Sequence, residues 1–388
     1  MSEPYDAICI GCGPAGNVAA WQMARAGLRV LMLDKQAFPR SKPCGGGLSA
    51  KALDALPYDV SEVVRRWIDG ACIRVDGRAD VAIGGQTFGA MVERAEFDAY
   101  MLQRASDAGA HAVTGRVIAL AERRGLVRVE TSAGSFTAPR VIGADGASST
   151  ARRLLFPGWR ARHAFAVEAK ICLPGIANVE AMRSCSQASL DFATVRDGYA
   201  WAFPKRDHFN VGIYRLRKRS LDSGMHCQLE RFIGELGGSR ADVMGSAVGH
   251  PIPLSDGTQP LGRGGVVLIG DAAGLGEAFF GEGIAFALQS GLISAQWAID
   301  TLDEGASDPA PAYAAAMRPM VARLNQSRVA AGALYAIPQR WLGHLAGQPA
   351  LVRLAVSFLC NPDRSPENSS EGTWREVARR ATASRPAL

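Results

Sequence analysis

The N-terminal segment alternates short apolar runs with one helical stretch. Residues 5–10 and 28–33 are dominated by apolar side chains, and runs of this length bounded by glycine predict buried β-strands. Between them, residues 17–26 have the apolar spacing of a helix, and Gly27 marks its end. The order strand, glycine turn, helix, strand predicts a βαβ unit of an α/β fold.

Later segments have the alternating pattern of half-buried strands. Residues 70–85, "GACIRVDGRADVAIGG", and residues 163–175 alternate apolar with polar side chains. Together with residues 184–214 they predict an antiparallel sheet, and residues 225–236 are its expected partner helix. Residues 309–360 are rich in Ala, Leu and Met, which predicts helices that pack into the core or cover an apolar ligand or a membrane.

Composition places the chain among soluble globular proteins. Of its 388 residues, 48% are hydrophobic and 21% are charged, and this length suits about two domains. The net charge of +6 and the pI near 9.0 suit an anionic cofactor, an anionic substrate or an anionic membrane surface. Since no run of like charge stands out, nucleic acid is not an expected partner.

The sequence does not predict a signal peptide, a transmembrane helix or a metal site. The start, "MSEPYDAICIG", lacks the layout of a signal peptide, and no uninterrupted apolar stretch predicts a transmembrane helix. Eight cysteines without a framework spacing favour a reduced, cytoplasmic protein. Cys9 and Cys12 form a C-x-x-C, but Cys9 falls in a predicted strand and no second pair completes a metal site.

The turn after the first strand contains a G-x-G-x-x-G pattern. Gly11 permits the tight turn, Gly13 admits a pyrophosphate, and Gly16 lets the helix pack on the strand. Free N–H groups at the helix start bind phosphate, and Asp34, after the second strand, is placed to bond a ribose hydroxyl. In this context the pattern predicts a dinucleotide site. The cofactor-binding residues expected here are Gly11, Gly13, Pro14, Ala15, Gly16, Asp34 and Lys35.

Three other segments resemble FAD motifs of the flavoprotein hydroxylase and reductase superfamily. Residues 265–291, "GVVLIGDAAGLGEAFFGEGIAFALQSG", resemble the second FAD motif, whose aspartate holds the ribityl chain and whose helix start faces the flavin ring. Residues 141–150, "VIGADGASST", resemble the D-G motif, and Arg94 resembles the arginine near the adenosine half. The resemblance implies FAD binding by Arg94, Asp145, Gly146, Gly270, Asp271, Gly281, Gly283 and Ile284.

Two segments are similar to motifs of the geranylgeranyl reductase family. Residues 39–53, "PRSKPCGGGLSAKAL", resemble its P-x-x-K-x-C-G-G-G motif, and residues 197–214 resemble its Y-x-W-x-F-P-K segment. The likeness implies that Cys44, Gly45 and Gly46 lie beside the flavin. The candidate catalytic residues that it implies are Cys44, Tyr199 and Trp201.

Two positions depart from that family's pattern. Tyr214 stands where the aromatic segment usually ends in glycine, near the expected substrate tunnel, and Ala278 stands where a proline is usual in the Asp271 loop. Both departures concern the fit of a long prenyl substrate rather than FAD binding.

The resemblance implies a Rossmann-type FAD-binding domain with an antiparallel-sheet substrate domain, so the fold class is α/β with an α+β second domain. The expected ranges are 1–75, 95–155 and 255–305 for the FAD-binding domain and 76–94 and 156–254 for the substrate domain. Residues 306–388 are expected to form a helical C-terminal region with a polar tail.

The implied activity is FAD-dependent reduction of carbon–carbon double bonds in an apolar, geranylgeranyl-like isoprenoid substrate. Reduced FAD delivers a hydride and a nearby acid supplies the proton. Because a free thiol, with a pKa of about 8.5, is a weak acid for an alkene, positioning by Cys44 is at least as well supported as proton donation. Aromatic residues expected to line an apolar tunnel, each of which fits the core equally well, are Trp201, Phe203, Phe209, Phe279 and Phe280.

A flavin monooxygenase, hydroxylase or halogenase-like enzyme acting on a small or aromatic substrate is the alternative, because such enzymes share the fold and the FAD motifs. The W-x-W-x-I-P signature of halogenases is absent. A flavin-binding sensor is a third hypothesis. Since no second G-x-G-x-x-G follows a strand, the expected electron donor is NADPH bound without its own Rossmann fold, or a ferredoxin-like protein. Peripheral membrane contact is a further expectation.

Overall fold

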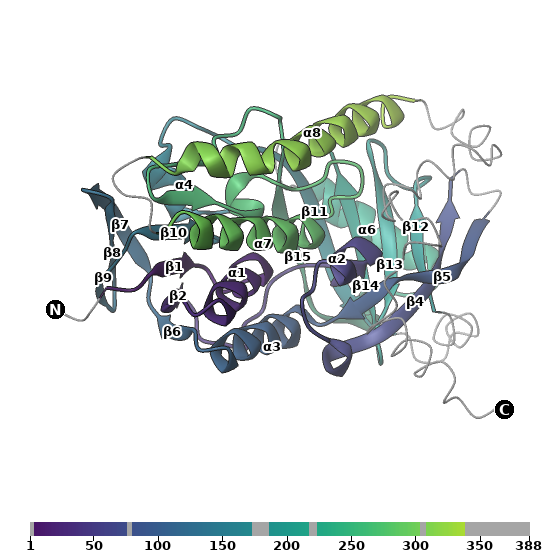
Figure 1. Ribbon diagram of the computed structural model, residues 1–388. Coiled ribbons are helices and arrows are strands. Elements are labelled where there is room, and N and C mark those ends of the chain that lie inside the picture. The colour runs from purple at the N-terminus through teal and green to yellow at the C-terminus, as the bar shows by residue number, and fades with distance from the viewer. Residues whose placement is uncertain (1–3, 76–79, 173–185, 217–222, 303–307, 338–388) are drawn as a thin grey trace. The chain divides into compact units, whose positions relative to one another are not determined.

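The computed structural model describes residues 4–75, 80–172, 186–216, 223–302 and 308–337 (Figure 1). The chain divides into two compact units, and each unit is assembled from separate stretches of sequence. The first unit comprises Met1–Lys42, Ala95–His163 and Pro251–Ala330. The second unit comprises Pro43–Arg94, Ala164–His250 and Ala331–Leu388.

The first unit is built on a six-stranded sheet in the order β16-β17-β10-β1-β2-β6. Every neighbouring pair is parallel except β16 and β17. The central strands are buried on both faces, which explains why their sequences are apolar throughout rather than alternating. The strands are β1 (Ala7–Ile10), β2 (Val30–Asp34), β6 (His111–Thr114), β10 (Arg140–Gly143), β16 (Gly262–Arg263) and β17 (Val266–Leu268).

Two helices of the first unit, α1 (Pro14–Arg25) and α7 (Ile284–Asp300), pack closely against each other. Glycine permits this approach, because a Cβ added to Gly291 would lie 2.5 Å from the carbonyl oxygen of Ala15. With β1 and β2 on either side of α1 in the chain, the predicted βαβ unit is confirmed.

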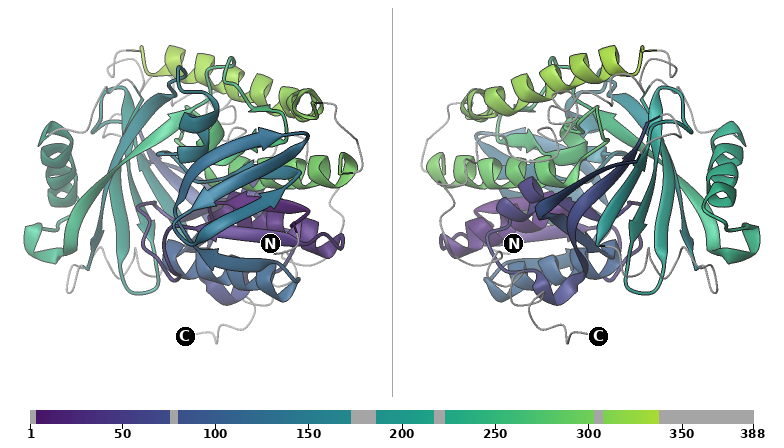
Figure 2. Two further views of the ribbon diagram at one scale, coloured as in Figure 1. Left: turned by 90° about the vertical axis from the view of Figure 1, so that its left-hand side faces the viewer. Right: turned by 90° about the vertical axis from the view of Figure 1, so that its right-hand side faces the viewer.

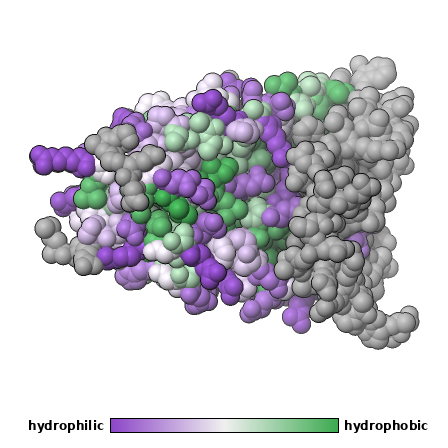
Figure 3. Space-filling model, viewed as in Figure 1, coloured by the Kyte–Doolittle hydropathy of each residue, from purple (hydrophilic) through white to green (hydrophobic). Residues whose placement is uncertain are grey.

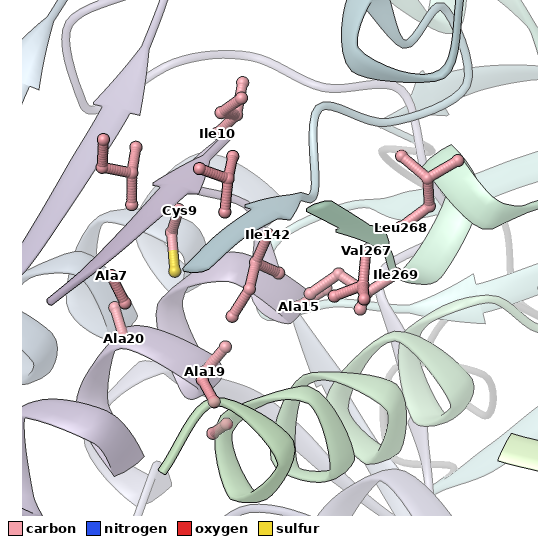
Figure 4. Close-up of a cluster of buried hydrophobic side chains, with 14 of the residues drawn as sticks. Ala7, Cys9, Ile10, Ala15, Ala19, Ala20, Ile142, Val267, Leu268 and Ile269 are labelled. Carbon is pink, nitrogen blue, oxygen red and sulfur yellow. The ribbon is translucent and has the colours of Figure 1, made fainter. Parts of the chain in front are cut away.

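The C-x-x-C pair lies in the core of the first unit. In Figure 4, Cys9 points from β1 toward the helix that carries Ala19 and Ala20. Cys9 and Cys12 are 0% and 2% exposed, and burial raises the pKa of the Cys9 thiol to about 12. The pair therefore packs as small apolar side chains. Among the residues described, no cluster of potential metal ligands is found.

A three-stranded antiparallel sheet adds a further layer to the first unit (Figure 2, left). Its central strand alternates exposed and buried residues, and the buried Val127 and Val129 belong to the same core as the parallel sheet. The strands are β7 (Val117–Arg123), β8 (Leu126–Thr131) and β9 (Gly134–Ala138).

The second unit is built on an eight-stranded sheet in the order β15-β11-β14-β13-β12-β4-β5-β3. The predicted antiparallel arrangement holds for pairs such as β11 with β14 and β13 with β14, but β12 and β4 are parallel, so the sheet is mixed. The strands are β3 (Gly47–Ser49), β4 (Val64–Arg74), β5 (Asp80–Val92), β11 (Arg162–Ile171), β12 (Gln187–Asp191), β13 (Gly198–Pro204), β14 (Phe209–Arg215) and β15 (Val243–Leu254).

One face of this sheet packs on α6 (Ser223–Glu235), the partner helix that the sequence predicts. Both views of Figure 2 show α6 against this sheet. Its buried Leu229 and Phe232 join alternate residues of the strands, such as Val167 and Val211, in one apolar cluster. The strand residues that alternate with those of the cluster point to the opposite face of the sheet, which carries the candidate site.

The two units differ from the expected domains at their boundaries. Residues 43–75, predicted in the FAD-binding domain, belong to the second unit because β3 and β4 are strands of its sheet, and residues 156–163 belong to the first. Of the predicted C-terminal helices, α8 (Ala310–Leu334) is present, whereas residues 338–388 lie outside the described residues. The remaining helices are α2 (Ala50–Asp54), α3 (Arg94–Asp107), α4 (Thr150–Leu155), η1 (Ser61–Val63), η2 (Arg240–Asp242) and η3 (Gly270–Ala273).

The ranges given above contain no candidate membrane-spanning helix. None of the helices there is long and apolar enough to cross a bilayer. On the coloured part of the face in Figure 3, hydrophilic and apolar residues are interspersed. Ile118 on β7 and Val329 on α8 are examples of exposed large apolar side chains, which are usual on globular surfaces.

Candidate functional site

The glycine turn of the first unit has the geometry of a dinucleotide site. Gly11 has a φ of +100°, and a Cβ added to Gly16 would lie 1.9 Å from the carbonyl oxygen of Gly11, so both glycines serve the turn itself. Gly13 is different, because the nearest atom to an added Cβ is the Arg40 guanidinium at 3.7 Å. Gly13 is also the N-cap of α1 and has no side chain to satisfy the first N–H groups, which leaves them for an anion.

Asp34 ends β2 beside this turn. Its Oδ2 accepts the N–H of Cys12 at 2.9 Å, and its Oδ1 accepts the N–H of Gln36 at 3.0 Å. Arg40 lies 3.7 Å from Asp34 and 3.4 Å from the carboxylate of Asp98. Arg40, which the sequence does not single out, therefore brings a cation next to the open position at the turn. The expected neighbours Pro14 and Ala15 are buried at the start of α1, and Lys35 is exposed.

A second cluster of the first unit gathers around Asp271. The Asp271 carboxylate accepts a hydrogen bond from Lys42 Nζ at 3.2 Å. A Cβ added to Gly283, the N-cap of α7, would lie 3.4 Å from the same carboxylate, and no side chain caps this helix. Gly270 and Gly281 have φ values of +53° and +67°, so both turns around the cluster require glycine. The predicted Ile284 is the first residue of α7.

Asp145 has a structural role that competes with cofactor binding. Its carboxylate accepts the hydroxyl of Ser149 and the N–H groups of Thr150, at 2.6 Å, and Ala151, at 3.1 Å. These are the first N–H groups of α4, whose N-cap is Ser149, so Asp145 supports the start of this helix. Gly146 follows with a φ of +79°, which a turn at this point requires.

In the second unit, a row of aromatic rings lies on the face of the sheet opposite α6. Tyr199, Trp201 and Phe203 alternate along β13, with ring centroids 6.1 Å and 6.0 Å apart. Gly212 is paired with Trp201, and a Cβ there would lie 2.1 Å from the indole, so glycine is required for the ring to cross β14. Tyr214, which stands where the family segment usually has glycine, lies next to Tyr199, and their ring centroids are 5.4 Å apart. We define Tyr199, Trp201, Phe203, Gly212 and Tyr214 as the aromatic face.

The glycine run 45–47 packs directly on this face. A Cβ added to Gly45 would lie 3.0 Å from the ring of Phe203 and 3.3 Å from Nε1 of Trp201. Gly46 has a φ of +66°, and a Cβ there would lie 2.2 Å from the carbonyl oxygen of Val92. These glycines are therefore required by contacts inside the second unit, and their predicted contact with a flavin stays a prediction. Arg94, predicted near the adenosine half, is buried at the start of α3.

Lys205, the last residue of the aromatic motif, holds the glycine run. Its Nζ donates to the carbonyl oxygens of Gly45 at 2.7 Å, Val92 at 2.8 Å and Gly46 at 3.4 Å. Burial lowers the pKa of Lys205 to about 8, against the opposing effect of the Glu93 carboxylate. The sequence identifies Lys205 only as part of a motif, and the contacts show what it positions.

Cys44 lies beside a carboxyl group that the sequence does not predict. Its backbone N–H donates to Oε1 of Glu168 at 2.7 Å, and Glu168 also has a side-chain hydrogen bond with Asn210. Trp201 Nε1 donates to Oδ1 of Asn210 at 2.8 Å, so the indole, the amide and the carboxyl are joined. The sequence signal that could have identified Glu168 is a glutamate within the predicted strand of residues 163–175. In the structure, this position pairs with Gly212.

Three aromatic predictions have different outcomes. Phe209 is paired with Pro204 and belongs to the apolar cluster with α6, so of its two interpretations, tunnel lining or core, the structure supports the core. Phe279 and Phe280 are buried in the first unit, with centroids 4.6 Å apart. Their N–H groups donate to the carboxylate of the buried Glu277, at 2.5 Å and 2.8 Å.

Comparisons with known proteins point to one family. Residues 6–177 match a family model described as Lycopene cyclase protein. The chain is 32% identical over 315 residues to the geranylgeranyl diphosphate reductase of Rhodobacter capsulatus, covering 78% of this chain and 76% of that protein. It is 30% identical over 324 residues to the menaquinone reductase of Mycobacterium tuberculosis, covering 76% of this chain and 77% of that protein.

A solved structure shows the same fold. The geranylgeranyl bacteriochlorophyll reductase-like protein of Thermoplasma acidophilum matches with a TM-score of 0.78 at 22% identity, covering 94% of this chain and 97% of that chain. The predicted fold class is therefore confirmed.

Proposed function

Since the chain belongs to the geranylgeranyl reductase family of FAD-dependent oxidoreductases, we propose that it reduces carbon–carbon double bonds in the isoprenoid chain of an apolar substrate. The observation that carries this proposal is the identity of at least 30% to two reductases over most of both chains. Geranylgeranyl diphosphate and menaquinone, the compounds in their names, both contain an isoprenoid chain. That chain is their common reducible part, and their polar groups differ.

The first unit has the features that FAD requires. The open N-terminus of α1 would hold the pyrophosphate beside Gly13, and Asp34 would bond the ribose. Asp271 would bond the ribityl chain, and the uncapped N-terminus of α7 would favour an anionic ring close to it. When bound and reduced, FAD supplies the hydride.

The second unit supplies a row of aromatic rings for contact with an apolar chain, of which Tyr199 and Trp201 are each only 5% exposed. The rings of Tyr199, Trp201 and Phe203 form a continuous row on one face, and apolar contact contributes about 0.8 kcal/mol per buried CH₂ group. Cys44 lies next to this row through Gly45. These contacts support the proposal that Cys44, Tyr199 and Trp201 orient the substrate and exclude water.

The electron donor and the location belong to the proposal as well. We infer NADPH as the reductant, bound without a second Rossmann fold, and a ferredoxin-like protein is the competing donor. The net charge of +6 supports transient contact with an anionic membrane surface, where an isoprenoid substrate resides. Sedimentation with anionic and with neutral vesicles tests this contact, and binding only to anionic vesicles is expected.

The decisive experiment uses the purified, FAD-loaded protein without oxygen. The flavin is reduced with dithionite, geranylgeranyl diphosphate is added, and the product is analysed by mass spectrometry. We expect reoxidation of the flavin and a product that gains two hydrogen atoms for each bond reduced. NADPH in place of dithionite then tests the donor. A protein that does not take up FAD, or a loaded protein that no isoprenoid substrate reoxidises, would overturn the proposal.

The monooxygenase alternative gives the opposite result. It requires oxygen, and its product gains an oxygen atom. The same incubation under air, followed by mass spectrometry, therefore separates the two activities.

A further inference from the structure

Glu168 is a carboxyl group on the face of the sheet that carries the row of aromatic rings, together with the polar Asn210 and Lys170. Its partner across the sheet is Gly212, the residue over which the Trp201 ring lies, so Glu168 is on the same face as the indole. Its side chain is partly exposed, and its Oε1 accepts the Cys44 N–H at 2.7 Å. Carboxyl groups on largely apolar faces require a reason, because their charged form is costly there.

The surroundings of Glu168 favour a protonated carboxyl. Burial raises its pKa, and this effect exceeds the opposing effects of the Cys44 N–H, the Asn210 amide and the ammonium groups of Lys205 and Lys170. Lys205 is itself held by three carbonyl oxygens, and Lys170 pairs with Glu93 at 2.5 Å. Both lysines therefore have other partners.

A carboxylic acid is also better suited than a thiol to protonating an alkene. The efficiency of a general acid depends on a pKa near the working pH, and a carboxyl whose pKa is raised approaches that condition from below. A free thiol, with a pKa of about 8.5, is the weaker acid. The N–H···O bond places the Glu168 carboxyl next to Cys44, so a substrate that contacts Cys44 would lie close to this carboxyl.

We propose that Glu168 donates the proton that completes reduction of the double bond, and that Trp201 and Asn210 hold it for this purpose. This inference rests on the proposed function. The alkene π electron pair takes the proton of the Glu168 carboxyl and forms a new C–H bond. The hydride for the other alkene carbon would come from reduced FAD, and the Glu168 carboxylate regains a proton from water.

The main test compares Glu168→Gln with Glu168→Asp in the FAD-loaded protein. Glutamine keeps an oxygen for the Cys44 N–H but has no acidic proton, whereas aspartate keeps the acid on a shorter side chain. After anaerobic reduction with dithionite, geranylgeranyl diphosphate is added and flavin absorbance is followed. We expect Glu168→Gln to slow reoxidation by about 100-fold or more, and Glu168→Asp to retain more of the rate.

Two readouts show that the rest of the protein is intact. FAD content and the reoxidation of reduced flavin by oxygen, which need no proton from Glu168, should equal those of the wild type in both variants. The wild-type rate with geranylgeranyl diphosphate should fall in D₂O, and the residual rate of Glu168→Gln should show a smaller solvent isotope effect.

The outcomes separate this inference from the proposed function. If the wild type is not reoxidised by any isoprenoid, both fail. If the wild type turns over and folded, FAD-loaded Glu168→Gln is within a few-fold of it, only the role of Glu168 is overturned. If Glu168→Gln does not fold, Glu168→Ala, which also lacks an acidic proton, decides. A folded, FAD-loaded Glu168→Ala that is reoxidised within a few-fold of the wild-type rate would refute proton donation.

Discussion

The two glycine-rich segments of the chain look alike in sequence but serve different neighbours. In the first unit, the position of Gly13 is open, with only the end of the flexible Arg40 side chain within 4 Å of an added Cβ. In the second unit, Gly45 and Gly46 are surrounded by the protein's own atoms, namely two aromatic rings, a carbonyl oxygen and an ammonium group. One segment leaves room for a ligand, and the other closes around its own side chains.

The difference shows that glycine alone does not identify a ligand contact. Backbone can approach a cofactor or another part of the protein equally closely, and both require the absence of a Cβ. The two cases differ in what fills the space beside the glycine, a ligand or other protein atoms. This depends on residues far away in the sequence. Substitutions in the two segments should therefore affect different properties, and their effects can be ranked.

Gly46→Ala should have the largest effect, and it should act on stability. The methyl group would lie 2.2 Å from the carbonyl oxygen of Val92, and the φ of +66° is strained for alanine. Together these should lower the free energy of unfolding by about 4 kcal/mol, measured by denaturant titration. Gly109→Ala is the control, because Gly109 has a φ of +106° with no atom within 4 Å, and it should lose only the strain. Equal losses in the two variants would contradict the packing argument.

Lys205→Met should have the next largest effect. It removes the donor to three carbonyl oxygens and leaves them without this partner, which should lower the free energy of unfolding by about 3 kcal/mol. Lys170→Met is the matched control, because the Lys170 side chain is 46% exposed and its pair with Glu93 should contribute about 1 kcal/mol or less. If Lys205→Met lost no more stability than Lys170→Met, the hydrogen bonds from Lys205 to the three carbonyl oxygens would contribute little.

Comparison of Lys205→Met with the wild type also predicts how the free energy of unfolding changes with pH. The pKa of Lys205 is lowered from 10.5 to about 8, so between these values the unfolded chain binds more protons than the folded chain. Wild-type stability therefore gains a contribution as the pH rises through this window. The difference in unfolding free energy between the wild type and Lys205→Met should grow over this range. A difference that shrinks would contradict the assignment.

Gly13→Ala should have a smaller effect, and it should act on FAD rather than on folding. The backbone at Gly13, with a φ of −81°, is accessible to alanine, so unfolding free energy should change by about 0.5 kcal/mol or less. FAD affinity, measured by titration of the apoprotein, should fall about tenfold or more, because a methyl group occupies the space for the pyrophosphate. Unchanged affinity would place the cofactor elsewhere.

Cys44→Ala and Cys44→Ser should lower the free energy of unfolding by only about 1 kcal/mol or less, because the bond to Glu168 uses the backbone N–H. FAD content and flavin reduction should be normal, while product formation should fall. Measuring these three quantities separately assigns Cys44 to the step after the flavin is reduced. Normal product formation in both variants would reduce Cys44 to a packing residue.

The parts of the fold that depend on local sequence were predictable. The βαβ unit follows from short apolar runs, a glycine turn and a helix, all within residues 5–34, and the structure confirms it. The second unit was less accessible, because its sheet brings together strands from distant segments. Residues 43–75 are a clear case, since nothing local shows that β4 pairs with β12.

The places of Phe209 and Glu168 could not be decided from the sequence, because both depend on strand register. Phe209 is an even number of residues from Trp201, which suggests the same face, but in the hairpin Trp201 pairs with Gly212 and Pro204 with Phe209. Odd positions of β13 therefore share a face with even positions of β14. Glu168 was missed for the same reason, because its place beside Cys44 depends on the pairing of β11 with β14.

The interleaved order of the two units has a consequence for synthesis on the ribosome. The six-stranded sheet needs β17, at Val266–Leu268, beside β10, and the eight-stranded sheet needs β12 beside β4. Neither sheet can be completed by an N-terminal fragment, so the emerging chain carries unpaired apolar strands until most of it has been made. Such long-range pairing slows folding and prolongs exposure of strand edges. This protein is therefore expected to depend on chaperones more than a chain whose domains follow one another in sequence.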